Sequence, residues 1–145
     1  MSDAFKAVSD SLSIVGQVTP EQLQQAAQQG FKSVLNLRSP NEPGVLSDEQ
    51  QKAAAAGLEY ANVPLNSSNA TAEGIANALK ELESLPKPVL VHCGAAQRAG
   101  GIALIATALN EGLTIEQITE KANELGLSPE QPHLRKFISE QNSND

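Results

Sequence analysis

Four short apolar segments recur along the chain, and each is separated from the next by a stretch of helix length. The segments are LSIVG at 12–16, KSVLNL at 32–37, EYANVPL at 59–65 and VLVHC at 89–93. The VLV run in the last segment is continuous rather than alternating, as expected of a strand covered on both faces. These segments predict buried strands of a sheet.

Helix start and stop signals fill the intervals between the strands. Capping boxes are predicted for Thr19 with Gln22, Ser47 with Gln50, Thr114 with Gln117, and Ser128 with Gln131. Gly30 and Gly57 stand where helix C-caps belong. The order β-α-β-α-β-α-β followed by helices predicts a three-layer α/β fold, with a central, mostly parallel sheet of four or five strands and helices on both faces.

Length and composition limit the organisation and the classes of function. The 145 residues, 40% of them hydrophobic, predict one compact domain over 1–145, with a flexible tail from about 139 to 145. A net charge of −7 argues against nonspecific binding to nucleic acid or anionic membranes. No run approaches the length of a membrane span and no cleavage-site pattern is present, so we expect a cytoplasmic protein.

The sequence offers few ligands for a metal and no disulfide. Cys93 is the only cysteine, and His92 and His133 are the only histidines. These are too few for a structural zinc site, so we expect no metal.

The carboxyl ends of parallel strands meet at one edge of a sheet, where α/β proteins bind ligands. The loop RSPNEPGVLSDEQ at 38–50, the loop NSSNAT at 66–71 and the loop after Cys93 should therefore converge. We expect the chemistry of the protein at this edge.

The segment VLVHCGAAQRAGG places Cys93 between a strand and a helix that begins near Arg98. A tight loop of small residues at a helix N-terminus presents backbone N–H groups to an anion, and the same donors would stabilise a cysteine thiolate. Cys93 is then a candidate nucleophile and Arg98 a planar clamp for two oxygens. The expected anion-binding residues are Gly94, Ala95, Ala96, Gln97, Arg98 and Ala99.

The same residues also have structural interpretations. A lone cysteine at a strand end is often a small buried hydrophobe, Arg98 could be a surface residue, and His92 is more typical of a packed strand than of a base. Gly100 and Gly101 are poor helix formers, and a close backbone approach explains them better than propensity does.

The segment VHCGAAQRAG resembles the signature of cysteine phosphatases. Together with GFKSVLNLRSPNE at 30–42, AAAAGLEYANVPLN at 53–66 and PVLVHC at 88–93, it is similar to a bacterial phosphatase-like domain family that also occurs beside beta-lactamase-like hydrolase domains. The resemblance covers roughly residues 12–110. It implies a protein tyrosine phosphatase-like fold and a cofactor-free phosphatase, in which Cys93 forms a cysteinyl-phosphate and Arg98 holds the phosphoryl group. The partner would be a phosphorylated protein or a small phosphorylated metabolite.

The sequence departs from the phosphatase signature in the loop itself. Four residues separate Cys93 from Arg98, where phosphatases have five, and rhodanese-type sulfurtransferases resemble this chain in using a shorter cysteine loop. Ala96 stands in place of a usual glycine. Ala99 replaces the usual Ser or Thr that helps the thiolate leave. A sulfurtransferase and a degenerate module that binds phosphate without turnover therefore stay open as alternatives.

The general acid of such phosphatases is an Asp on a neighbouring loop, and this chain has Asn66 there. The nearest carboxylates are Glu42, Asp48 and Glu73, each expected as a capping or surface group. For Arg38, a place at the pocket mouth and a place in solvent are equally expected. His133, in the segment PHLRKF, is expected at the surface.

Overall fold

The structure is a computed structural model that describes residues 5–39, 42, 48–65, 71–94, 96–128 and 130–143, without the side chains of 141–143. Over these residues the elements are β1 (Lys6–Ala7), β2 (Leu12–Val15), α1 (Pro20–Gln28), β3 (Ser33–Asn36), α2 (Glu49–Ala55), β4 (Glu59–Asn62), α3 (Ala72–Ser84), β5 (Val89–His92), α4 (Gln97–Glu111), α5 (Ile115–Glu124) and α6 (Pro132–Ser143).

The five strands form one sheet in the order β1-β2-β5-β3-β4. β2, β5, β3 and β4 run parallel, with Leu12 and Ser33 both opposite Val89, and only β1 is antiparallel. The α/β fold and the mostly parallel sheet are confirmed. The two-residue β1 was not predicted, because two exposed residues carry no hydrophobic period.

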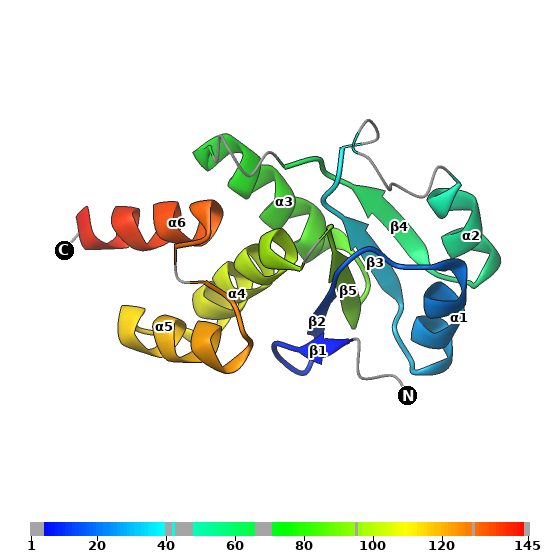
Figure 1. Ribbon diagram of the computed structural model, residues 1–145, viewed down its shortest axis with the longest axis horizontal. Coiled ribbons are helices and arrows are strands. Elements are labelled where there is room, and N and C mark those ends of the chain that lie inside the picture. The colour runs from blue at the N-terminus through cyan, green and yellow to red at the C-terminus, as the bar shows by residue number, and fades with distance from the viewer. Residues whose placement is uncertain are drawn as a thin grey trace.

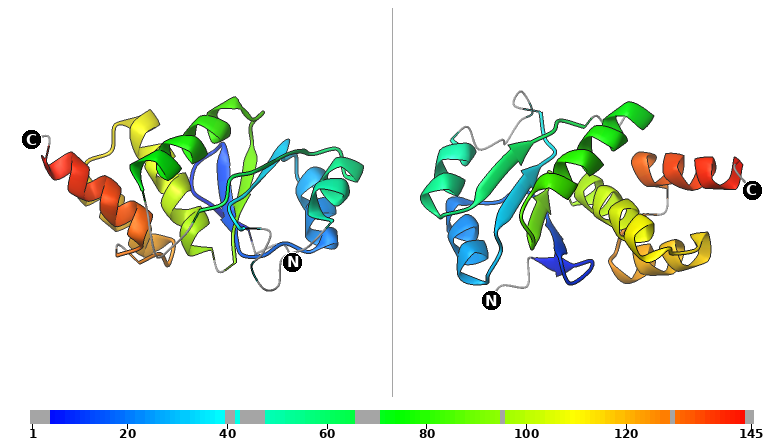
Figure 2. Two further views of the ribbon diagram at one scale, coloured as in Figure 1. Left: turned by 90° about the horizontal axis from the view of Figure 1, so that it is seen from above. Right: turned by 180° about the vertical axis from the view of Figure 1, so that it is seen from behind.

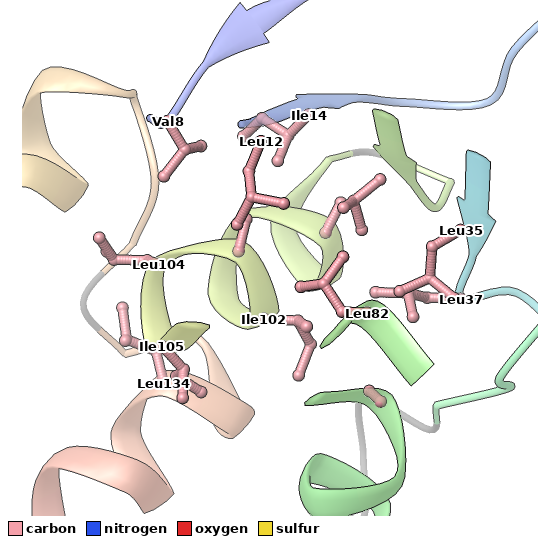
Figure 3. Close-up of a cluster of buried hydrophobic side chains, with 14 of the residues drawn as sticks. Val8, Leu12, Ile14, Leu35, Leu37, Leu82, Ile102, Leu104, Ile105 and Leu134 are labelled. Carbon is pink, nitrogen blue, oxygen red and sulfur yellow. The ribbon is translucent and has the colours of Figure 1, made fainter. Parts of the chain in front are cut away.

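Helices cover both faces of the sheet, as Figures 1 and 2 show. On one face, α1 and α2 pack over Val34 and Leu90. On the other, α3 and α4 pack over Leu35 and Val91, and α5 and α6 pack against α4. Successive strand residues thus enter opposite cores, which is the period-two alternation of a strand covered on both sides. The larger core lies around α4 (Figure 3).

Helix α4 follows β5 and is the central helix of the larger core. Ile102, Leu104 and Ile105 are fully buried, and α3, α5 and α6 all contact this helix. A helix that is apolar all round is a buried helix. Its packing against β2 and β5 fixes its N-terminus at the carboxyl end of β5.

Most of the predicted helix ends are confirmed. Thr19 and Thr114 form complete capping boxes on α1 and α5. Gly30 and Gly57 take the positive φ angles of helix ends, at 100° and 85°. Ser47 lies outside the described residues, and Asp48 before α2 makes no side-chain capping bond.

The predicted box of Ser128 with Gln131 is wrong. α6 begins one residue after Gln131, and the side-chain oxygen of Gln131 itself accepts from the N–H of Leu134 at 3.0 Å. The Ser128 hydroxyl instead accepts from the N–H of Glu130. The helix start lies three residues later than the box pattern indicated.

α6 extends into the polar tail. Its residues 139–143 fall in the segment predicted to be flexible, and 144 and 145 lie outside the described residues, so the flexibility of the tail stays a prediction. The helix is anchored by buried Leu134 and Phe137, and the following residues contain no Gly or Pro that would end it. Over the described part of the chain, no helix is long and apolar enough to cross a membrane.

Candidate active site

The end of β5 directs His92 and Cys93 to opposite faces of the sheet. Cys93 is 1% exposed and belongs to the larger apolar core, while His92 lies on the face covered by α1 and α2. The Cys93 sulfur accepts a hydrogen bond from the backbone N–H of Ala99 in the first turn of α4, at 3.3 Å. The cysteine is therefore both a buried core residue and a thiol at a helix N-terminus, so the two interpretations of Cys93 do not exclude each other.

The loop after Cys93 turns into α4 through a left-handed residue. Ala96, the N-cap of α4, has a φ of 72°, a conformation that costs a non-glycine residue about 1 kcal/mol. Ala96 thus adopts the backbone conformation for which a glycine would be the ordinary residue. Gln97 begins the helix, and its side-chain oxygen accepts from the N–H of Ser128. Ala95 lies outside the described residues.

Gly100 and Gly101 allow the segment between α5 and α6 to approach the first turns of α4. A Cβ added to Gly100 would lie 2.3 Å from a methyl carbon of Leu127, and one added to Gly101 would lie 2.4 Å from the side-chain oxygen of Gln131. The close approach expected from the sequence is confirmed. This contact fixes the helix whose N-terminus meets the cysteine.

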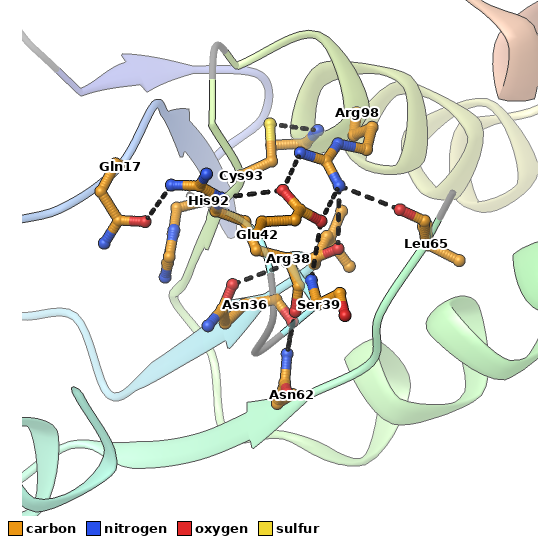
Figure 4. A network of polar contacts seen from close by, with 12 residues as sticks. Gln17, Asn36, Arg38, Ser39, Glu42, Asn62, Leu65, His92, Cys93 and Arg98 are labelled. Atoms are coloured by element: carbon orange, nitrogen blue, oxygen red, sulfur yellow. Dashed lines mark hydrogen bonds and ion pairs between the residues drawn. The ribbon is translucent and has the colours of Figure 1, made fainter. Parts of the chain in front are cut away.

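Arg98 lies beside Cys93, and Glu42 binds it end-on (Figure 4). Nη1 and Nη2 of Arg98 each donate to one oxygen of Glu42, both at 2.9 Å. Nη1 also donates to the carbonyl of Leu65 at 2.9 Å. Hydrogen bonding to Glu42 is the main cause of a raised Arg98 pKa, and the negative charge of Cys93 contributes. Among the described residues, no oxygen accepts from Nε, and a side-chain hydrogen bond with Cys93 also raises the Arg98 pKa.

Glu42 is held by four donors. Besides the two bonds from Arg98, it accepts from Nε of Arg38 at 3.0 Å and from the N–H of Ser39 at 2.8 Å. Hydrogen bonding, first of all from Arg98, lowers the pKa of Glu42 to about 2. The expectation of a capping or surface role is wrong, because the path of the 38–42 segment brings this carboxylate to Arg98. A group so acidic holds no proton to donate near neutral pH.

Arg38 is buried and is not a solvated loop cation. It is 8% exposed, and Nη1 donates to the side-chain oxygen of Gln17 at 2.8 Å. A Cβ built on Gly94 would lie 3.6 Å from Cζ of Arg38 and 3.6 Å from Nη2 of Arg98. Two guanidinium groups therefore border the first residue after the cysteine.

A buried polar network lies on the other face of the sheet, next to His92. Nε2 of His92 pairs with Glu49 at the start of α2, and the side-chain nitrogen of Gln17 donates to the same carboxylate at 3.2 Å. Asn36 donates to the hydroxyl of Tyr60, whose pKa is raised to about 12, mainly by burial. His92 is thus the packed strand residue that the sequence favoured. The contacts of Gln17 and Glu49 in this network were not predicted. Gln17 does follow β2 at the sheet edge where the loops were expected to converge.

The other candidate residues fall into two groups. Asp48 and Glu73 are surface groups at the starts of α2 and α3, as expected, and Asn66 lies outside the described residues. The prediction that His133 lies at the surface is wrong, because this residue is 1% exposed where the first turn of α6 packs against α4. Its Nδ1 pairs with the Gln131 amide at 3.0 Å, and burial, together with the charge of Arg98, lowers its pKa.

The described residues contain no group of three or more His, Cys, Asp or Glu side chains that could hold a metal ion. The described part of the site consists of a thiol, two guanidinium groups, a carboxylate and helix N–H groups. Such a set can bind an oxyanion next to a sulfur nucleophile.

Comparison with known proteins identifies the class of domain. Residues 4–110 match the family described as the phosphatase-like domain of the beta-lactamase hydrolase-like protein. The chain belongs to this family. The beta-lactamase hydrolase-like protein of Xylella fastidiosa (strain Temecula1) is 32% identical over 124 residues, which are 82% of this chain and 27% of the relative. That of Agrobacterium fabrum (strain C58) is 30% identical over 106 residues, 71% of this chain and 25% of the relative. The chain thus spans about a quarter of the length of these curated relatives.

Solved structures confirm the protein tyrosine phosphatase-like fold. A DUF442 protein from Shewanella putrefaciens CN-32 superposes with a TM-score of 0.78 at 24% identity, over 97% of this chain and 90% of that one. The structure named Tk-PTP in the active form gives a TM-score of 0.76 at 20% identity, over 97% and 99% of the two chains. Because both identities are below 25%, the similarity shows a shared fold and nothing about activity.

Proposed function

We propose that this domain is a cysteine-dependent phosphomonoester hydrolase. The observation that carries the proposal is the position of the Cys93 sulfur, which accepts the Ala99 N–H at the N-terminus of α4 with the Arg98 guanidinium beside it. Membership of the phosphatase-like family supports the same reaction. Phosphate, a tetrahedral dianion, suits helix N–H groups and a planar arginine fork.

In the proposed mechanism, the Cys93 thiolate attacks phosphorus while the bond to the leaving oxygen breaks. The S–P bond of a cysteinyl-phosphate forms, and the leaving oxygen takes its proton from water. Arg98 and the N–H groups of the loop and α4 hold the non-bridging oxygens as charge develops on them. Water then attacks phosphorus, and the thiolate departs as phosphate is released. Glu42 orients Arg98 in both steps, because it binds Nη1 and Nη2 at the end of the guanidinium and does not bind Nε.

The site favours substrates with good leaving groups. Glu42 is ionised at neutral pH, and Asp48 and Glu73 lie at helix starts on the surface. Asn66, at the place of the usual acid, is an amide. Without an acid, the leaving oxygen must accept its negative charge unaided, which aryl phosphates tolerate best. We propose a phosphorylated protein or a small phosphorylated metabolite as the natural substrate.

The test is hydrolysis of para-nitrophenyl phosphate by wild type and by Cys93→Ser, from pH 5 to 8 under reducing conditions. We expect activity in the wild type and none in the variant. The rate should not fall at the upper end of this range through loss of an acid. Equal activity in both proteins would overturn the nucleophilic role of Cys93.

One observation favours a second candidate, a rhodanese-like sulfurtransferase. Only four residues separate Cys93 from Arg98, and Ala99 provides no hydroxyl to help a thiolate leave phosphorus. In that reaction the thiolate attacks the outer sulfur of thiosulfate, sulfite departs, and cyanide removes the sulfur from the persulfide as thiocyanate. Thiocyanate formation without phosphate release would decide for this candidate. Phosphate binding without either product would indicate a binding module.

A further inference from the structure

Glu49 is a charged group buried at the back of the site. It is 2% exposed, pairs with Nε2 of His92 and accepts from the side-chain nitrogen of Gln17, and its hydrogen bond to Tyr60 contributes to the raised pKa of that residue. Burying a carboxylate costs several kcal/mol of desolvation, which such partners offset only in part. An apolar residue at the start of α2 would avoid this cost. The placement of the charge therefore requires an explanation other than stability.

Gln17 connects Glu49 to the cysteine loop. Its backbone N–H donates to the carbonyl of Gly94 at 3.3 Å. Its side-chain nitrogen donates to Glu49 at 3.2 Å, and its side-chain oxygen accepts from Nη1 of Arg38 at 2.8 Å. One residue thus contacts the loop backbone, the buried carboxylate and a guanidinium at the mouth of the site.

These contacts continue to Arg98 without a break. Nε of Arg38 donates to Glu42, and Glu42 binds Arg98 end-on. The chain of contacts begins at His92, immediately before the cysteine, and ends at the arginine that borders it (Figure 4 shows its members from Gln17 to Arg98). We propose that Gln17 and Glu49 are positioning residues, which hold Arg38 and, through Glu42, the orientation of Arg98 toward Cys93. This inference rests on the proposed function of Cys93 in an anion site.

A donor and acceptor exchange tests the proposal. Gln17→Met removes the side-chain bonds to Glu49, Arg38 and the Val18 carbonyl at similar size, and Gln17→Glu alone sets two carboxylates against each other. Combining Gln17→Glu with Glu49→Gln restores the contacts to Arg38 and between positions 17 and 49 in reverse. The carboxylate at position 17 accepts from Arg38 and from the amide at position 49, whose oxygen faces His92, and only the bond to the Val18 carbonyl stays lost. Gln25→Met, on the exposed side of α1, is the matched control.

The readout uses the single cysteine of the chain. Cys93 is alkylated with anionic iodoacetate and with neutral iodoacetamide, and the ratio of the two rates reports how strongly the site attracts an anion. We expect Gln17→Met and Gln17→Glu to lower this ratio about tenfold, the equivalent of one charge-assisted hydrogen bond. The double variant should regain most of it, and Gln25→Met should equal the wild type. Circular dichroism establishes that each variant is folded.

An unchanged ratio in folded Gln17→Met would overturn the proposal, even if its melting temperature fell, because that result indicates a structural role alone. A double variant with the same low ratio as Gln17→Glu would overturn it as well. Hydrolysis of para-nitrophenyl phosphate is measured in parallel. Absence of hydrolysis in the wild type counts against the proposed phosphatase and leaves the alkylation ratio as a test of positioning.

Discussion

The two faces of the sheet differ most where His92 and Cys93 leave β5. On the side of Cys93, the neighbours are small or apolar residues of α4, and one backbone N–H meets the sulfur. On the side of His92, the neighbours are Glu49, Gln17 and a network of polar side chains. Packing places the nucleophile, whereas a polar network orients the charged side chains around it. Changes on the two faces should therefore fail in different ways.

The largest expected effect concerns Arg98, the charged residue of α4 beside Cys93. Arg98→Lys should lower kcat about 10²–10³-fold, because a lysine cannot bind two oxygens of the phosphoryl group as the guanidinium fork does. Steady-state hydrolysis of para-nitrophenyl phosphate measures this. Arg135→Lys, at an exposed ion pair, is the control and should match the wild type. A kcat within threefold of wild type would remove Arg98 from the mechanism.

On the apolar side, Gly100→Ala should act on stability first. The new methyl group would meet Leu127 at 2.3 Å, and such overpacking costs about 1–3 kcal/mol, more than the helix propensity gained. Urea unfolding measures the free energy. Gly101→Ala should cost less, because the long side chain of Gln131 can move aside. In a Leu127→Ala background the cost of Gly100→Ala should shrink, and an unchanged cost would contradict the contact.

The contribution of Glu42 to the unfolding free energy should depend on pH. Its pKa is lowered from 4.5 to about 2, so its bonds stabilise the folded state above pH 4.5 and are lost as the pH falls toward 2. The gap in unfolding free energy between wild type and Glu42→Gln should be widest above pH 4.5 and narrow below it. Urea unfolding at several pH values measures this gap. Glu130→Gln, at an exposed pair, should show almost none. A gap independent of pH would contradict the paired carboxylate.

The smallest effect concerns His133, a polar residue within the apolar side. Its pKa is lowered from 6.5, mainly by burial, so the unfolded chain takes up the proton more readily. The wild type should therefore lose stability relative to His133→Gln as the pH falls below 6.5, and not above it. Thermal unfolding from pH 5 to 8 checks this. A relative loss at rising pH would show that the folded state favours the charged imidazole.

The sequence was sufficient for the fold and for bringing Cys93 and Arg98 together as candidate site residues. Continuous apolar segments and capping boxes predicted the sheet and its layers, because both are local patterns. Cys93 and Arg98 were found since they lie five residues apart in one motif. The partners of the charges were not, because Glu42 meets Arg98 only through the path of a loop. His133 was misplaced because the docking of α6 on α4 leaves no signal in the local hydrophobic period.

The mass of the protein during turnover shows whether Cys93 carries the phosphoryl group. Wild type is mixed with para-nitrophenyl phosphate, quenched within the first turnovers and examined by intact and peptide mass spectrometry, with a parallel sample in thiosulfate. Because Ala99 offers no hydroxyl to aid the departing thiolate, we expect a phosphoryl adduct to accumulate on Cys93. If the wild type releases phosphate without any adduct, and Cys93→Ser is as active as the wild type, Cys93 is not the nucleophile. A sulfur adduct from thiosulfate alone would assign the site to sulfur transfer.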